Sequence, residues 1–321
     1  MNVLSSPVTA FGLLFILFAI YTILDGYALG IGCLVPWIRK KAVADRLVDH
    51  IAPVWEANEV WLVMAIGFLF AAFPAAFAIL CSTFYLPLMT VAGALALRAV
   101  ALEFSYHDPR RTRFWRSLLG LGSFLILFSL AGSLGFVLAG LPFRGPDDIR
   151  SEITAAQAPL ALLFGLSGLG FFIWHGILHA RTGLQAAPLS RPESLVWALT
   201  VLLSLVTAMV WISGTPGLPA KPFFAPGILV YLTGLLVSRR LTDRGAWAFR
   251  ATALAILGLW VAVAACLFPN LLVSANNPDW SLSILQASAP ASSLQVVLMT
   301  TPILAIVIAG YSICIQRIVR R

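Results

Sequence analysis

The chain has 321 residues, of which 60% are hydrophobic and only 11% are charged, and its mean hydropathy is +0.94. A water-soluble domain of this length carries about twice that charged fraction, so a soluble fold is excluded. The net charge of +8 does not indicate a nucleic-acid partner, because Lys and Arg collect in the cytoplasmic loops of membrane proteins.

Apolar runs of about twenty residues, long enough to cross a bilayer as helices, recur along the chain. They predict an all-α, polytopic membrane protein with nine transmembrane helices, in which residues 1–321 form a single membrane domain. The predicted helices cover 8–36, 58–80, 83–103, 117–140, 159–180, 194–213, 224–238, 249–269 and 294–316. Pro74 and Pro87 predict kinks in the second and third helices, and the seventh helix is short and contains Pro226.

The first apolar run is expected to be a retained helix, because it lacks the positive n-region of a signal peptide and contains Asp25. Four cysteines are scattered through apolar segments without a CxxC pair, so neither a disulfide framework nor a metal knuckle is indicated. Two connections, 141–158 and 270–293, are long enough to carry structure of their own.

The distribution of basic residues tests the nine-helix assignment and predicts its orientation. The connections at 38–57, 104–116, 181–193 and 239–250, together with the C-terminus, hold 17 of the 21 basic residues. The opposite set of connections holds only 3, and the remaining basic residue is Arg98 inside the third helix. Because basic loops stay in the cytoplasm, the N-terminus is predicted outside and the C-terminus inside.

Five ionisable residues of the first three helices are predicted to gather near the cytoplasmic face: Asp25, Glu56, Glu59, Arg98 and Glu103. Charged groups inside a membrane are costly and by default indicate function. A chain of carboxylates beside a cation could carry protons from the cytoplasm into the bilayer. The structural alternative is that Arg98 only neutralises one or two acids and ties three helices together.

Two pairs of residues spaced four apart allow both a structural and a functional interpretation. Gly26 and Gly30 form a small-xxx-small face that favours close helix packing over chemistry. His175 and His179 share one face of the fifth helix, at a spacing that suits a metal ion, and a lone histidine can hold haem iron. No third ligand is recognisable nearby, so hydrogen-bonded packing is favoured and no metal site is predicted.

Several motifs resemble subunit II of cytochrome bd-type quinol oxidases. Residues 25–32 (DGYALGIG) look like that family's DGFDLGVG, and residues 51–61 (IAPVWEANEVW) look like its I-x-P-x-W-D-G-N-[QE]-V-W. Shorter matches are 70–74 (FAAFP), 82–88 (STFYLPL), 97–103 (LRAVALE), 268–270 (FPN), 281–282 (SL), 287–288 (AS) and 292–294 (SSL). The stretch from 25 to 103 is the specific part, whereas 104–265 match mainly in hydropathy.

The resemblance implies a nine-helix subunit, arranged as two four-helix bundles plus one peripheral helix, in the bacterial cytoplasmic (inner) membrane. Its partner, subunit I, would bind haems b and d and oxidise quinol while dioxygen is reduced to water with cytoplasmic protons. This chain would bind no haem, although a structural quinone or lipid is expected, and a small single-helix accessory subunit is a further expected partner.

The resemblance also implies a role for two residues, because acids at positions matching Asp25 and Glu56 are a proposed proton entrance of the family. The clustering of charges adds Glu59 and Glu103 as candidates for the same pathway. Arg98 is the candidate charge partner, and Trp55, Asn58, Gly26 and Gly30 are assigned to helix packing beside it.

Departures from the family pattern weaken the proton pathway. Ala28 stands where the family has a second acid, Val54 stands where it often has His, and Glu56-Ala57 replaces the usual Asp-Gly. Two alternatives therefore stay open: a structural partner whose complex takes up protons elsewhere, and a proton-coupled membrane transporter. Against the transporter, the ionisable residues of the first third have no evident counterparts later in the chain.

Overall fold

The structure is a computed structural model that describes residues 6–143, 155–184, 192–215 and 218–319. Eight of its helices are long and apolar enough to cross a membrane, which makes the chain a multi-pass membrane protein. Their bounds are α1 Pro7–Leu34, α3 Trp55–Ala72, α5 Tyr85–His107, α6 Thr112–Ala139, α7 Ala158–Leu184, α8 Pro192–Gly214, α10 Gly245–Leu267 and α12 Ala291–Val319. The predicted seventh span is α9, Phe224–Arg240, a helix of 17 residues that is not among these eight.

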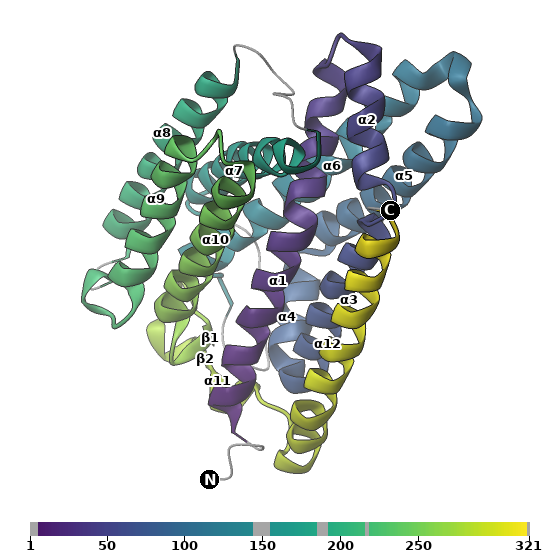
Figure 1. Cartoon of the computed structure of the whole chain (residues 1–321). Helices are drawn as coiled ribbons and strands as arrows, with labels where there is room; N and C mark the ends of the chain where they lie inside the picture. Colours follow the sequence, from purple (N-terminus) through teal and green to yellow (C-terminus); the bar gives the residue numbers. More distant parts are fainter. Residues whose placement is uncertain (1–5, 144–154, 185–191, 216–217, 320–321) are drawn as a thin grey trace.

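Helix α1 lies at the centre of the molecule and packs against α3, α6, α7 and α10 (Figure 1). On one side of it α5 packs along α6, and on the other side α7, α8, α9 and α10 pack against one another. Helix α12 packs along α3 at the periphery. The division into two four-helix bundles plus a peripheral helix and the membrane crossing of α9 both stay predictions.

The second predicted span is divided into two helices. Helix α3 ends at Ala72, Phe73 leaves helical geometry, and α4, Pro74–Thr83, begins with Pro74. A proline has no N–H to donate and fits the first helical position, so the break at Pro74 follows from its chemistry. The expected kink at Pro87 is wrong, because this residue lies in the first turn of α5, where no intrahelical hydrogen bond is lost.

Further short elements lie between the predicted spans. The 3₁₀ turn η2, Val35–Trp37, follows α1, and within 38–57 lies the helix α2, Lys41–Ile51, which buries Ala44, Leu47, Val48 and Ile51. The connection before α12 contains β1, Asn270–Leu272, η5, Pro278–Trp280, β2, Leu282–Ser283, and α11, Ile284–Ala287. The short turns η3, Pro109–Arg111, and η4, Leu218–Ala220, precede α6 and α9.

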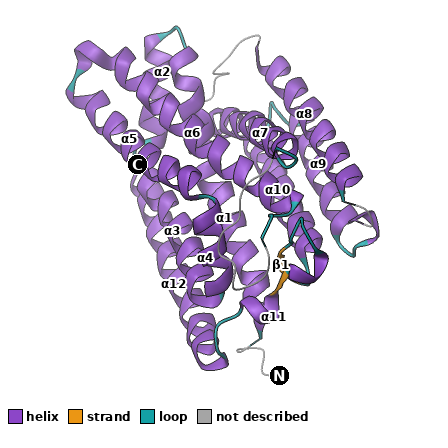
Figure 2. Cartoon of the chain, turned by 180° about the vertical axis from the view of Figure 1, so that it is seen from behind, coloured by secondary structure: helices purple, strands orange, loops and turns teal. Residues whose placement is uncertain are grey.

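The strands β1 and β2 pair antiparallel and fold the last connection back onto the helix ends (Figure 2). The Leu141 N–H donates to the Val273 carbonyl at 2.8 Å, which ties the end of α6 to this connection. The prediction that 270–293 carries structure is confirmed. Residues 144–154 of the other long connection, with Arg144 and Arg150, lie outside the described residues.

Candidate functional site

Three of the five predicted ionisable residues form one buried cluster, which we call the ion cluster: Asp25 of α1, Glu59 of α3 and Arg98 of α5. The Arg98 Nη2 lies 3.2 Å from Asp25 Oδ1, and its Nη1 lies 3.3 Å from Asp25 Oδ2 and 2.8 Å from Glu59 Oε1. The side chains of Asp25 and Arg98 are 0% exposed, and that of Glu59 is 17% exposed. One guanidinium therefore binds carboxylates from two other helices.

The neighbouring side chains hold this cluster between its helices. Asn58 of α3 donates from Nδ2 to the Leu24 carbonyl at 2.8 Å, directly before Asp25 on α1. The Trp55 ring centroid lies 6.0 Å from the Arg98 guanidinium carbon, a cation–π contact. Gly122 lets α6 approach α5 closely, because a β-carbon there would lie 2.9 Å from the Ala94 carbonyl oxygen.

The two other predicted acids lie outside the ion cluster. Glu56 is exposed, one turn before Glu59 on α3. The Glu103 side chain is 73% exposed and its carboxylate lies 3.6 Å from the His107 ring. The structure thus divides the predicted set into a buried group of three and two surface carboxylates.

Two buried polar atoms around the ion cluster have no hydrogen-bond partner among the described residues. They are the Asn58 Oδ1 and the Arg98 Nε. Tyr21 stands four residues before Asp25, one turn away on the same face of α1. Tyr21 is not among the predicted site residues, although its position four residues before Asp25 can be read from the sequence.

Gly26 and Gly30 bring α1 and α7 into close contact, as the small-residue face indicates. A β-carbon at Gly26 would lie 2.4 Å from the Phe172 ring, and one at Gly30 would lie 1.8 Å from the Phe172 carbonyl oxygen. From the opposite helix, a β-carbon at Gly176 would lie 2.8 Å from the Ile31 nitrogen. At Gly30 and Gly176 the contact is with backbone, so these positions admit only glycine unless the helices separate, whereas at Gly26 the Phe172 ring would have to move.

His175 and His179 make separate hydrogen bonds. The buried His175 lies with Nε2 3.2 Å from the Ile23 carbonyl, to which it donates, and with Nδ1 2.7 Å from the Thr252 hydroxyl. His179 instead lies with Nδ1 3.0 Å from Nε2 of His50 on α2, and its ring stacks on Tyr27. Both ring nitrogens of His175 are engaged, so this residue does not fit haem or metal ligation.

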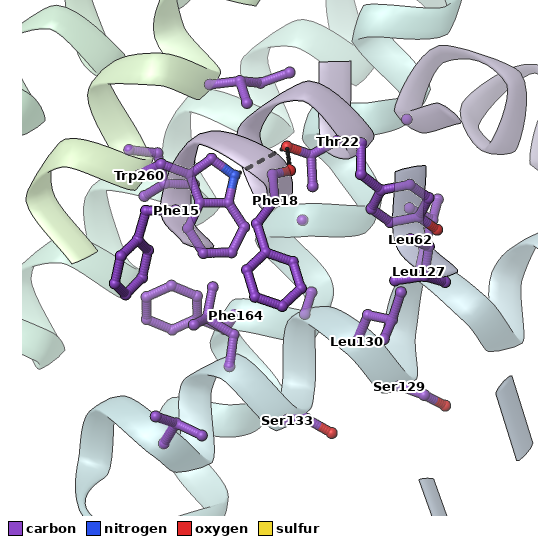
Figure 3. Close-up of a pocket in the computed structure, with 18 of the residues that line it drawn as sticks. Phe15, Phe18, Thr22, Leu62, Leu127, Ser129, Leu130, Ser133, Phe164 and Trp260 are labelled. Atoms are coloured by element: carbon purple, nitrogen blue, oxygen red, sulfur yellow. Dashed lines mark hydrogen bonds between the residues drawn. The ribbon is translucent and has the colours of Figure 1, made fainter. Parts of the chain in front are cut away.

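An apolar cavity of about 320 Å³ lies between the helices beside the ion cluster. Tyr21 and Gly26, which flank Asp25 on α1, are among the residues that line it. Figure 3 shows Phe15, Phe18, Phe164 and Trp260 around it, with Leu62, Leu127 and Leu130 nearby. The Trp260 N–H donates to the Thr22 hydroxyl at 2.9 Å, so the polar edge of this ring is satisfied.

Comparison with known proteins reveals relatives along nearly the whole chain. A subunit 2 of cytochrome bd-I ubiquinol oxidase from Escherichia coli is 27% identical over 91% of this chain and 88% of the relative. The cytochrome bd ubiquinol oxidase subunit 2 of Bacillus subtilis is 25% identical over 89% of this chain and 87% of its own length. A probable cytochrome oxidase subunit 2 from Haemophilus influenzae is 26% identical over 91% of this chain and 88% of the relative.

A solved structure and a family model agree with these relatives. The structure of bd oxidase from Geobacillus thermodenitrificans contains a chain that superposes with a TM-score of 0.79. That match covers 97% of this chain and 98% of the other at 17% identity, and it establishes the fold. The model of cytochrome bd terminal oxidase subunit II matches residues 6–319. The chain therefore belongs to the cytochrome bd terminal oxidase subunit II family.

Proposed function

We propose that this chain is the haem-free subunit II of a quinol:oxygen oxidoreductase in the bacterial inner membrane. It supports a haem-bearing subunit I and delivers cytoplasmic protons through the ion cluster for the reduction of dioxygen to water. The family match along residues 6–319 carries the assignment to the complex. The buried contacts among Asp25, Glu59 and Arg98 support the proton role.

The charge balance of the ion cluster favours the uptake of one proton. Two ionised carboxylates and one guanidinium carry a net charge of −1, and an uncompensated charge in a medium of low polarity is costly. One added proton makes the cluster neutral, and its later release restores the anion. Such a group can accept a proton from one side and pass it to the other.

The exposure of the carboxylates gives this transfer a direction. Glu59 is partly exposed and lies 2.8 Å from Arg98 Nη1, whereas Asp25, which contacts Nη1 and Nη2 of the same guanidinium, is fully buried. Glu56, exposed one turn before Glu59, would collect protons at the surface. Next to the ion cluster, the Asn58 Oδ1 provides a polar atom to which water could hydrogen-bond.

The assignment to an oxidase complex is tested by purification of the chain from its native membrane under mild conditions. We expect a haem-rich second subunit to co-purify in equal amount, and the preparation to consume oxygen when quinol is supplied. A homogeneous, haem-free preparation of this chain alone, without quinol-dependent oxygen uptake, would contradict the proposal.

The apolar cavity supports a second part of the proposal, a bound structural quinone or lipid chain. Its walls are aromatic and aliphatic, as expected for a site that buries an isoprenoid or acyl chain. Extraction of the purified complex into organic solvent, followed by mass spectrometry, is expected to yield about one such molecule per chain. A complex that retains activity but releases neither a quinone nor a lipid would contradict this part of the proposal.

A further inference from the structure

A second cavity, also of about 320 Å³, lies where α1 ends and α6 begins, at the predicted cytoplasmic side. We call it the basic pocket. Its walls come from η2, the start of α2, η3 and the first turns of α6, and they include Trp37, Arg39, Lys41, Arg110, Arg113 and Arg116. Five cationic side chains thus surround one small volume, and none of them belongs to the ion cluster.

Only one of these cations has an acidic partner among the described residues. Arg116 forms an ion pair with Asp45 of α2 and donates to the Lys41 carbonyl at 3.2 Å. The other four form no ion pair with any carboxylate in the described parts of the chain. Like charges held together repel one another, so the basic pocket favours an anion that arrives from outside the chain.

The surroundings of the basic pocket indicate an anion with an apolar body. The pocket lies at the end of two membrane-spanning helices, where tryptophan is enriched at the boundary between lipid and water. Trp37 is 80% exposed, and on α6 the side chains of Phe114, Leu121 and Phe124 are 53%, 48% and 38% exposed. These three lie near one face of α6, so this helix presents exposed apolar side chains to the membrane beyond the pocket.

We propose that the basic pocket binds the phosphodiester headgroup of an anionic phospholipid of the cytoplasmic leaflet. Guanidinium groups donate paired hydrogen bonds to phosphate oxygens, and basic pockets beside transmembrane helices on this side attract anionic lipids. The acyl chains lie along the exposed apolar face of α6. A soluble phosphate compound would use the same cations but would gain nothing from Trp37 and Phe114.

The test compares lipid binding by two doubly substituted chains. The purified full-length chain, or its complex, is delipidated in detergent and titrated with phosphatidylglycerol or phosphatidylcholine, and bound lipid is measured by native mass spectrometry. The pocket variant is Arg39→Gln with Arg113→Gln. The control is Arg239→Gln with Arg240→Gln, which removes two exposed positive charges at the end of α9 on the same predicted side.

We expect the unaltered chain to prefer phosphatidylglycerol, and the pocket variant to lose roughly 25-fold in affinity for it, about fivefold per arginine. The control should change this affinity by less than about twofold. Equal binding of phosphatidylglycerol by both variants would overturn the proposal. Binding of inorganic phosphate as tight as that of phosphatidylglycerol would also overturn the proposal. An assembled complex in which a partner protein excludes lipid from the pocket would do the same.

Discussion

Arg98 is the residue on which the buried charges depend, because its guanidinium contacts the carboxylates of both Asp25 and Glu59. The sequence alone identified these three residues, since a charge inside an apolar run is conspicuous. It did not identify which acids meet, because the rotation of each helix is set by packing rather than by its own composition. Glu103 illustrates this limit: it shares α5 with Arg98 but faces away from the ion cluster.

Replacement of Arg98 should destabilise the fold more than replacement of an exposed arginine. Arg98→Gln leaves the buried Asp25 carboxylate without its cation, and loss of one partner of a buried pair costs about 3–5 kcal/mol. Thermal unfolding of the detergent-solubilised chain measures this loss. Arg240→Gln, at an exposed position, is the control and should change stability by less than about 0.5 kcal/mol. Equal melting temperatures for the two variants would show that Arg98 does not stabilise the fold.

At the scale of helices, glycine positions determine which elements meet. The contact of α1 with α7 at Gly30 follows a small-residue spacing that the sequence displays. Helix α2 was missed although Ala44, Leu47, Val48 and Ile51 follow a helical spacing, because its charged opposite face gives the segment the low hydropathy of a connection. The break between α3 and α4 was foreseeable at Pro74, but its extent depends on the geometry at Phe73.

Gly30→Ala should separate α1 from α7 and lower stability by about 1–3 kcal/mol or more, because its β-carbon would meet the Phe172 carbonyl. Gly12→Ala is a matched control on the same helix, where a β-carbon meets nothing within 4 Å. That substitution should be neutral or stabilising by up to about 1 kcal/mol, through helix propensity alone. Melting temperatures of the two variants check the contrast, and an unaffected Gly30→Ala chain would refute the close contact.

At the scale of the whole molecule, hydropathy and charge predicted the class of fold, since the bilayer demands apolar helices and positive inner loops. The number of crossings is less directly determined, because α9 has only 17 residues, near the lower limit for a span. The last connection, with its small sheet, could be foreseen as structured but not in its pairing. Its pairing depends on the contact with the end of α6.

The orientation and the crossing of α9 can be mapped with single cysteines in a chain whose four native cysteines are replaced by serine. Ala220→Cys and Asp279→Cys should react with a membrane-impermeant thiol reagent on intact cells. Asp243→Cys, between α9 and α10, should react only after permeabilisation. If Ala220→Cys and Asp243→Cys were labelled from the same side, α9 would not cross the membrane.

Quinol-driven oxygen uptake by the assembled complex with Asp25→Asn tests the central claim most directly. The amide keeps the size of the side chain and leaves Arg98 paired with Glu59, but it cannot exchange a proton with the ion cluster. We predict a fall of at least roughly tenfold in turnover with unchanged haem spectra, restored in part by Asp25→Glu. Asp243→Asn, exposed and remote from the ion cluster, should retain full turnover. Full turnover of Asp25→Asn, with intact haem spectra, would contradict proton delivery through this subunit and leave it a structural partner.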